Sequence, residues 1–131
     1  MIVVVDASVL VPALVDDGGS GALARERLLA ADVHVPALAD VEVLSAVRRA
    51  VLAGRLPAQR GAEALQDWSE LTVERYPHLP LLGRAWQLRD SVSAYDAQYV
   101  ALAELLDVPL VTADGRLARA PGLRCPVDLL S

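Results

Sequence analysis

The sequence predicts a single α/β domain in which a mainly parallel central sheet is flanked by helices. The chain has 131 residues, a length that suits one compact domain, and we expect residues 1–131 to form it. Its first apolar run, residues 2–5, is continuous and β-branched, the pattern of a strand buried on both faces. Strand-like and helix-like segments then alternate, with no repeat, linker or low-complexity stretch.

Hydrophobic periodicity locates the individual elements. Continuous β-branched runs predict buried strands, whereas apolar residues three or four positions apart predict helices. The expected strands are residues 2–5, 33–36, 72–74, 109–112 and 126–129, the last of them at an edge. The expected helices are residues 8–15, 20–31, 38–53, 57–71, 81–91 and 94–106, with a short helical piece after Asp114-Gly115.

Residues at the ends of these elements support the assignment. Ser8 is placed to cap the first helix, where Pro12 is tolerable only because it falls near the first turn. Residues 16–19 form a turn cluster before the second helix. Gly54 is a typical C-cap for the third helix, and Pro57 is a typical first residue for the fourth.

Charge and residue usage exclude several classes of protein. The net charge is −5, whereas modules that bind nucleic acid by simple attraction to phosphate are usually basic. All 12 basic residues are Arg, and the chain contains no Lys. P-loop nucleotide hydrolases, Schiff-base enzymes and response-regulator receiver domains each need a lysine, so these classes are excluded.

The few cysteine and histidine residues restrict the cellular compartment and the kinds of metal site that the chain can form. Cys125 is the only cysteine and cannot form an internal disulfide, which suits a reducing cytoplasm. His34 and His78 are the only imidazoles and stand far apart, so a zinc site of Cys and His lacks ligands. The opening apolar run is too short for a signal-peptide core, and no apolar stretch approaches membrane-spanning length. We expect a cytoplasmic protein without a membrane partner.

Four acids fall at strand ends or helix starts. In open parallel sheets, functional sites form beyond the carboxyl ends of the strands. Asp6 follows the first strand, and Asp114 stands two residues past Thr112. Glu42 lies early in the third helix, and Asp96 lies in the first turn of the last long helix. All four are therefore candidates to converge on one edge of the sheet.

Such a set of acids suits a hard divalent cation. Carboxylate oxygens without His prefer Mg²⁺ or Mn²⁺ to Zn²⁺. Without a metal, crowded carboxylates repel one another, and some of their pKa values rise. Two divalent ions, about 3.5–4 Å apart in two-metal sites, activate a water and stabilise a leaving oxygen. The sequence leaves open whether one ion or two would bind.

Each acid also has a purely structural explanation. Ser93 and Asp96 have the spacing of a capping box, in which Asp96 only satisfies a backbone N–H. Asp6 suits the cap of the first helix, Asp114 suits an ordinary turn, and Glu42 suits a solvated helix face. A cap and a metal ligand are compatible roles, because the first turn of a helix holds a carboxylate rigidly.

Other site motifs lack their required context. Residues 19–24 fit the glycine-rich fingerprint of dinucleotide binding, but no strand directly precedes them, because Pro12 disfavours one there. The chain has no G-x-S-x-G elbow of a serine hydrolase. A phosphatase of the haloacid-dehalogenase type needs Asp where Ser8 stands.

The four acids lie in four separate segments, which follow one another along the chain as residues 2–10, the region of Glu42, residues 95–103 and residues 110–114. Together, in this order and at this spacing, they resemble the motifs of the PIN-domain family, specifically of VapC-type toxins. The match covers nearly the whole chain, and the joint occurrence of four motifs makes it specific. The absence of Lys departs from many members of the family and leaves RNA contacts to Arg.

The resemblance implies a metal-dependent endoribonuclease that uses Mg²⁺ or Mn²⁺ and leaves a 5′-phosphate and a 3′-hydroxyl. It also implies a homodimer and inhibition by a cognate VapB-type antitoxin. By position, the metal ligands would be Asp6, Glu42, Asp96 and Asp114, and Thr112 would supply a supporting or water-orienting hydroxyl. The alternative is a noncatalytic protein-interaction module with a PIN-like fold, which would keep the sheet and lose the metal.

Further candidates concern RNA and protein partners. Four arginines form either a solvated helical face or a phosphate-binding rim: Arg48, Arg49, Arg55 and Arg60. Five aromatic residues either pack in the core or at an interface, or stack on splayed bases: Trp68, Trp86, Tyr76, Tyr95 and Tyr99. For dimerisation and antitoxin capture we expect an apolar helix surface that includes Leu10, Leu14, Leu28 and Leu29.

Overall fold

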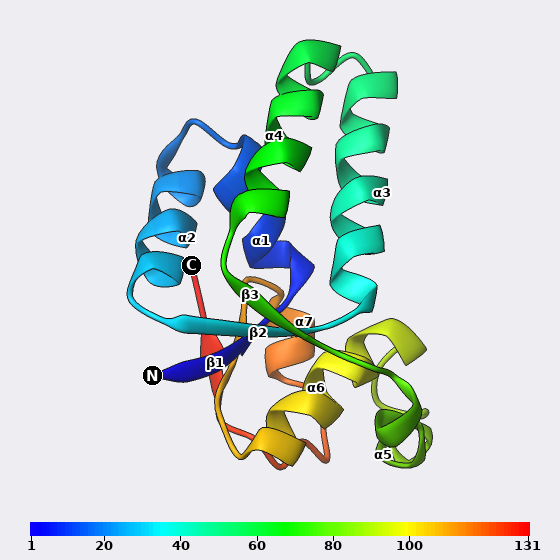
Figure 1. The fold of residues 1–131 in the computed structure, drawn as a ribbon. Helices are drawn as coiled ribbons and strands as arrows, with labels where there is room; N and C mark the ends of the chain where they lie inside the picture. Colours follow the sequence, from blue (N-terminus) through cyan, green and yellow to red (C-terminus); the bar gives the residue numbers. More distant parts are fainter.

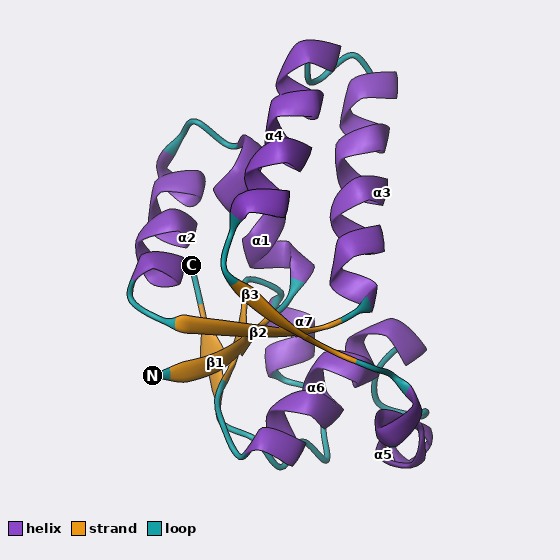
Figure 2. Cartoon of the chain, in the orientation of Figure 1, coloured by secondary structure: helices purple, strands orange, loops and turns teal.

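The computed structural model describes residues 1–131 and contains a five-stranded sheet with helices on both faces (Figures 1 and 2). Neighbouring strands are all parallel, in the order β3-β2-β1-β4-β5. The predicted α/β architecture is confirmed, and the last strand lies at an edge. The strands are β1 (Ile2–Val5), β2 (Asp32–Pro36), β3 (Val73–Tyr76), β4 (Leu110–Thr112) and β5 (Val127–Leu129).

Helices α1 to α4 lie on one side of the sheet, and α6 covers the other (Figure 1). Helices α3 and α4 form an antiparallel pair that projects away from the sheet (Figure 1). No helix is both long and apolar enough to cross a membrane. The helices are α1 (Ala7–Val15), α2 (Gly19–Leu29), α3 (Leu38–Leu52), α4 (Ala58–Glu70), α5 (Leu82–Gln87), α6 (Ala94–Leu106) and α7 (Gly115–Ala118), with a 3-10 turn at Leu79–Leu81.

The core lies around the two central strands. Residues 3–5 of β1 and residues 110–112 of β4 have no exposed surface, because helices cover both of their faces. On α6, residues 97–103 are all buried, so this helix is apolar around most of its circumference. The continuous apolar run that predicted the first strand is therefore explained by burial on both faces.

Two predicted helices differ in detail from the observed ones. Asp6, not Ser8, caps α1: its side chain accepts a hydrogen bond from the Ser8 N–H at 3.1 Å. The helix therefore starts at Ala7, and Pro12 lies inside it rather than near its first turn.

The helix expected over residues 81–91 is shorter than predicted. A 3-10 turn leads into the short α5, and the chain then leaves the helix through turns, one of which is closed by a hydrogen bond from Ser91 N–H to the Leu88 carbonyl at 2.9 Å. The predicted end of the third helix is confirmed, since Gly54 follows α3 with a φ of 75°.

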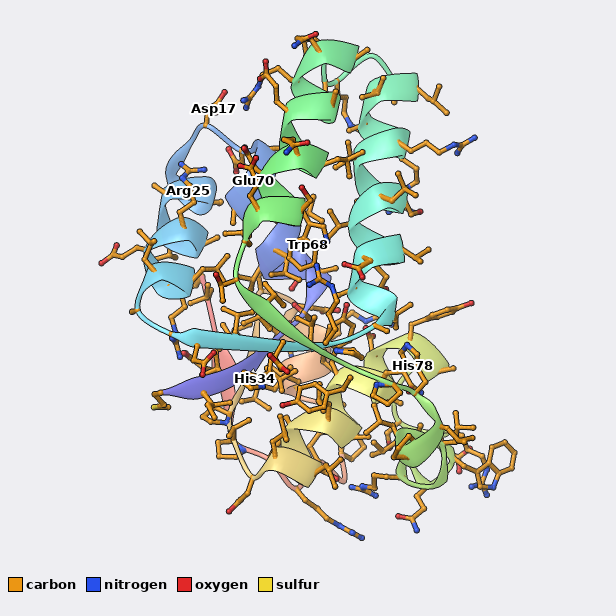
Figure 3. The ribbon with its side chains drawn as sticks, viewed as in Figure 1. Asp17, Arg25, His34, Trp68, Glu70 and His78 are labelled. Carbon is orange, nitrogen blue, oxygen red and sulfur yellow. The ribbon has the colours of Figure 1, made fainter.

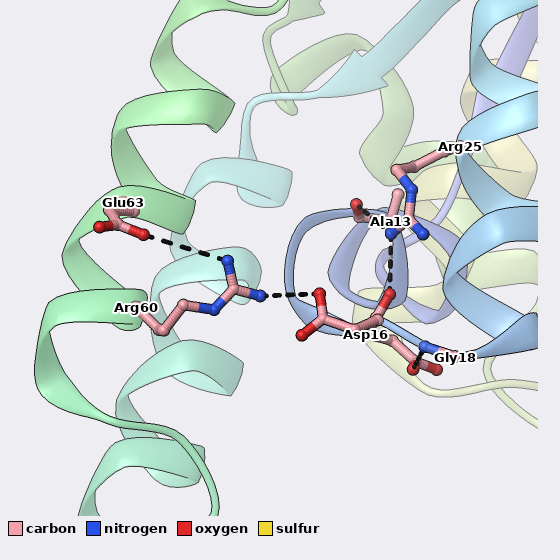
Figure 4. A network of polar contacts seen from close by, with 7 residues as sticks. Ala13, Asp16, Gly18, Arg25, Arg60 and Glu63 are labelled. Atoms are coloured by element: carbon pink, nitrogen blue, oxygen red, sulfur yellow. Dashed lines mark hydrogen bonds and ion pairs between the residues drawn. The ribbon is translucent and has the colours of Figure 1, made fainter.

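A polar network fixes the turn between α1 and α2 against α4, far from the carboxyl ends of the strands (Figure 4). Arg60 of α4 lies 3.1 Å from Asp17 in this turn and 4.0 Å from Glu63 of its own helix. Arg25 of α2 donates to the Asp16 carbonyl at 2.8 Å. Arg60, one of the arginines considered for phosphate binding, is therefore engaged in an internal ion pair.

Candidate active site

The four predicted acids lie at the edge of the sheet where the parallel strands end. Asp6 directly follows β1, and Asp114 lies two residues after the last residue of β4. Glu42 lies early in α3, which follows β2, and Asp96 lies in the first turn of α6. Asp6 is only 4% exposed, and the other three side chains are half-buried.

Hydroxyl groups hold the Asp6 carboxylate on both of its oxygens. Oδ1 accepts hydrogen bonds from the amide and the hydroxyl of Ser8, and Oδ2 accepts one from the Thr112 hydroxyl at 2.7 Å. Ser8 Oγ in turn accepts the Ala113 N–H at 2.8 Å, and Thr112 Oγ1 accepts the Asp114 N–H at 3.0 Å. These bonds tie the turn after β1 to the turn after β4.

Burial and mutual repulsion raise the pKa values in this cluster. Burial raises the pKa of Asp6 from 3.8 to about 6, against the hydrogen bonds from Ser8 and Thr112, and the charge of Asp96 adds to the rise. Burial also raises the pKa of Asp96, with a further contribution from the charge of Asp114. The Asp96 carboxylate therefore lies close enough to Asp6 on one side and to Asp114 on the other for the charges to repel.

No cationic side chain compensates these charges. None of the four acids forms an ion pair with any of the arginines or histidines of the chain. Six other acids do form such pairs: Asp17, Asp32, Asp40, Glu63, Glu104 and Asp128. Of the seven remaining acids, which also form no ion pair, all but Asp16 are exposed to solvent. The four site acids therefore differ from most other unpaired acids in being buried or half-buried without a counter-charge.

Tyr99 links Glu42 to the other acids. The Tyr99 side chain is 1% exposed, and its hydroxyl donates to Glu42 Oε1 at 2.6 Å. Burial, this bond and the nearby charges of Asp6 and Asp96 all raise the pKa of Tyr99, so the hydroxyl keeps its proton. Sequence reasoning missed this role. The signal that could have found it is the three-residue spacing between Asp96 and Tyr99, which puts both on one face of α6.

His78 joins the two helices that carry Glu42 and Asp96. Its Nε2 accepts the Leu38 N–H at the start of α3 at 2.9 Å, and its Nδ1 lies 3.0 Å from Gln98 Oε1 on α6. Because Nε2 accepts a hydrogen bond, Nδ1 carries the proton and donates it to Gln98. The residue before α3 provides no capping side chain, so His78 takes that role from a distant loop (Figure 3).

Two of the acids line a polar cavity of about 640 Å³. Asp96 and Asp114 share this cavity with three arginines, namely Arg89, Arg116 and Arg119. All three guanidinium groups are exposed and form no ion pair within the protein. The cavity therefore combines carboxylates with guanidinium groups that form no ion pair within the protein and whose chemistry suits phosphate.

A second cavity of about 400 Å³ opens beside Glu42. Its lining includes Arg49. This residue lies seven positions, or about two turns, after Glu42 on the same side of α3. Of the four arginines considered from the sequence, Arg49 is the one at this cavity. Arg48 and Arg55 are exposed and line neither cavity.

Two of the acids also have the structural role that their positions suggested, whereas the Asp96 carboxylate accepts no backbone N–H and Glu42 is half-buried against Tyr99. Asp6 caps α1, and Asp114 caps α7 by accepting the Arg116 N–H at 2.9 Å. Ser93 caps α6 by accepting the Asp96 N–H at 3.1 Å. Capping holds the Asp6 and Asp114 carboxylates at the helix starts, which is compatible with a binding role.

The donors fit a divalent cation in chemistry and in charge. They are all carboxylates, without a compensating cation, and Oε2 of Glu42 and Oδ2 of Asp114 accept no hydrogen bond from the protein. The side chains do not surround a single point, however, because no three metal-binding side chains stand close enough together to hold an ion. The structure thus brings the acids to one edge without forming a closed coordination shell.

The four leucines predicted for partner binding line one apolar cavity of about 310 Å³ beside α1, α2 and β3: Leu10, Leu14, Leu28 and Leu29. The prediction that all four present surface is wrong for Leu10, which is 1% exposed and belongs to the core. Leu29, by contrast, is 89% exposed. The cavity is therefore a partly open apolar hollow with Leu10 on its buried side.

The aromatic residues divide by exposure. Trp68 on α4 is 5% exposed and, like Tyr99, belongs to the core (Figure 3). Tyr76 is half-buried and bonds to the ring of His34 at 2.6 Å. Trp86 and Tyr95 are 67% and 62% exposed. Only these last two are available for stacking on a base.

Comparison with known proteins identifies the family. The PIN-domain profile matches residues 3–123. Ribonuclease VapC9 of Mycobacterium tuberculosis is 46% identical over 128 residues, with 98% of each chain covered. VapBC2 from Rickettsia felis, solved with a DNA fragment from its promoter, has a TM-score of 0.73 at 14% identity over all of both chains. A toxin–antitoxin complex from Klebsiella pneumoniae has a TM-score of 0.62 at 20% identity and covers 96% of this chain and 95% of its own. The chain therefore belongs to the PIN-domain family, where its curated relatives are VapC ribonucleases.

Proposed function

We propose that this protein is a VapC-type toxin that cleaves RNA with Mg²⁺ or Mn²⁺ and is inhibited by an antitoxin. A relative of nearly the same length at 46% identity, named a ribonuclease, supports RNA hydrolysis. One observation carries the proposal of a metal: four acids share one edge of the sheet and no cationic side chain neutralises them. Carboxylates in such a setting favour a divalent cation.

In this proposal Asp6, Glu42, Asp96 and Asp114 are the metal ligands. A Mg²⁺ or Mn²⁺ ion bound by these residues would supply an activated water and would stabilise charge on the leaving 3′ oxygen. Asp6 is oriented by Ser8 and by Thr112, whose hydroxyl donates to Oδ2 at 2.7 Å. The bond from Tyr99 orients Glu42 in the same way.

Arginines at the two cavities bind the RNA backbone in this proposal. Arg49 lies on the Glu42 side of the acids, and Arg89, Arg116 and Arg119 lie on the side of Asp96 and Asp114. A guanidinium donates two parallel hydrogen bonds to a phosphate, which positions the phosphodiester as well as attracting it. Attack by water with departure of the 3′ oxygen leaves a 5′-phosphate and a 3′-hydroxyl.

The partner proposal concerns the apolar cavity lined by Leu14, Leu28 and Leu29. A cavity of about 310 Å³ with mainly hydrophobic lining suits an apolar segment of an antitoxin or of a second copy of the chain. Leu28→Asp should then weaken antitoxin capture or self-association, measured by light scattering, and leave RNA cleavage intact. If Leu28→Asp changes neither antitoxin binding nor self-association, this role of the cavity is rejected.

The function is tested with the purified protein and total RNA in Mg²⁺, in Mn²⁺ and in EDTA. We expect cleavage in both metals and none in EDTA, with 5′-phosphate ends on the products. A noncatalytic interaction module would cut RNA in none of the three buffers. Equal cleavage with and without EDTA would overturn the metal-dependent mechanism.

A further inference from the structure

Trp86 and Arg89 form an exposed aromatic–cation pair on the segment that leads into α6. The guanidinium carbon of Arg89 lies 4.5 Å from the Trp86 ring centroid. Arg89 Nη1 also donates to the Trp86 carbonyl oxygen at 3.0 Å, which holds the guanidinium over the indole. Because Trp86 is still 67% exposed, much of the indole remains open to a ligand.

This pair adjoins the polar cavity. Arg89 lines that cavity together with Asp96 and Asp114, and its guanidinium carbon lies 4.5 Å from the indole, so the indole lies next to a residue of the cavity wall. Arg116 and Arg119 line the same cavity, and none of the three arginines is neutralised by an ion pair. An anionic chain bound along these arginines would pass beside Trp86.

We propose that Trp86 stacks on an unpaired base of single-stranded RNA, next to the phosphates that Arg89, Arg116 and Arg119 bind. This inference rests on the proposed ribonuclease function and adds a base-binding position to it. Single-stranded RNA combines a phosphate backbone with exposed aromatic faces, and a tryptophan beside unpaired arginines matches both features. A protein partner matches less well, because most residues that line this cavity are charged or polar.

Binding is measured in EDTA, where the proposed cleavage does not occur, with short single-stranded oligo(U) and oligo(A). Trp86→Ala should weaken binding of both about tenfold, and Trp86→Phe should keep most of the affinity. Leu52→Ala is the matched control: Leu52 is 68% exposed, at the end of α3, and lines neither site cavity. It should bind like the wild type, and thermal melts should show that all three variants are folded.

Fluorescence reports the contact directly. In a Trp68→Phe protein, Trp86 is the only tryptophan, and oligo(U) should protect it from quenching by acrylamide. An abasic oligomer with the same number of phosphates should bind wild type and Trp86→Ala equally, because it retains the phosphates and lacks the bases.

Two results would overturn the inference. One is wild-type affinity of Trp86→Ala for both oligonucleotides. The other is a loss of self-association in Trp86→Ala without a change in RNA affinity, which would assign Trp86 to a protein interface. Either result leaves the proposed function standing if the wild type cuts RNA in Mg²⁺, whereas absence of metal-dependent cleavage rejects the function itself.

Discussion

Two acids on α6 have opposite electrostatic surroundings. Glu104 lies 2.6 Å from Arg84 and accepts the Arg124 N–H at 2.7 Å, so its pKa is lowered although burial alone would raise it. Asp96, at the other end of the helix, has no cationic partner, and burial together with Asp114 raises its pKa. The same helix therefore carries one neutralised acid and one that is left without a counter-charge. The difference supports the proposal that the acids at the sheet edge bind a cation from solution.

The largest expected difference between Asp96 and Glu104 is in the rate of RNA cleavage after each is substituted. Asp96→Asn should lower RNA cleavage by about two orders of magnitude or more, because a metal held by few ligands loses its position when one is neutralised. Glu104→Gln should retain cleavage. Initial rates in Mg²⁺ buffer give the comparison. The same large loss is expected for Asp6→Asn, Glu42→Gln and Asp114→Asn.

If all four variants of the acidic cluster cleave RNA near the wild-type rate, the assignment of the site is wrong. If Glu104→Gln loses cleavage as severely as Asp96→Asn while remaining folded, the contrast between the two ends of α6 has no functional meaning.

The second-largest effect is expected in the pH dependence of stability, which should differ between the acids of the cluster and the paired Glu104. The pKa of Asp6 is about 6 in the folded protein against 3.8 as its ordinary value, so the folded state binds this proton more tightly. In EDTA, lowering the pH from about 7.5 towards 5 should therefore stabilise the protein at this site by about 1 kcal/mol. The limit of about 3 kcal/mol is reached only below the ordinary pKa of 3.8, where the unfolded state is protonated as well. Glu104 acts in the opposite direction, because its lowered pKa gives stability that is lost as the pH falls.

Urea unfolding at several pH values, on wild type and Asp6→Asn, measures the Asp6 contribution as a difference. Asp6→Asn should lack the stabilisation on acidification and should be more stable than wild type at pH 7.5 in EDTA. An identical pH dependence of the two proteins would show that Asp6 does not hold a raised pKa.

Removing the paired acid should affect stability more than activity. Glu104→Gln leaves Arg84 without its charged partner in a pair whose side chains are 19% and 11% exposed. We expect a loss of about 1–3 kcal/mol in the free energy of unfolding at neutral pH. A stability equal to that of wild type would show that the pair contributes nothing to the fold.

The smallest expected effect concerns the support of Glu42. Tyr99→Phe removes one hydrogen bond to Glu42 Oε1 and should lower cleavage about tenfold, corresponding to one lost hydrogen bond to a charged group. Tyr95→Phe is the control, because Tyr95 is on the same helix, 62% exposed, and forms no hydrogen bond through its hydroxyl. Equal rates for the two variants would reject the role of Tyr99.

The parts of the molecule that local sequence determines were predictable. The buried strand at residues 2–5, the parallel sheet and the positions of the acids follow from apolar runs and from the residues next to them. Two neighbouring polar residues, Asp6 and Ser8, were both plausible caps, and the choice between them depends on φ and ψ at the turn.

Contacts between distant segments were not predictable in the same way. Tyr99 meets Glu42 across 57 positions, and His78 caps α3 across 40. Both contacts depend on how α3 and α6 pack at the strand ends, and periodicity carries no information about that packing. The exposure of Trp86 and the burial of Trp68 were likewise set by tertiary packing rather than by local sequence.

The most direct test of the central claim, that the uncompensated acids bind a divalent cation, is a set of thermal melts with EDTA and with Mn²⁺. If the acids bind the cation, Mn²⁺ should raise the melting temperature of wild type and of Glu104→Gln. No such rise is expected for Asp6→Asn, which should already melt higher than wild type in EDTA because the repulsion is relieved. An Asp6→Asn protein that melts lower than wild type in EDTA and still responds fully to Mn²⁺ would contradict the claim and leave Asp6 as a helix cap.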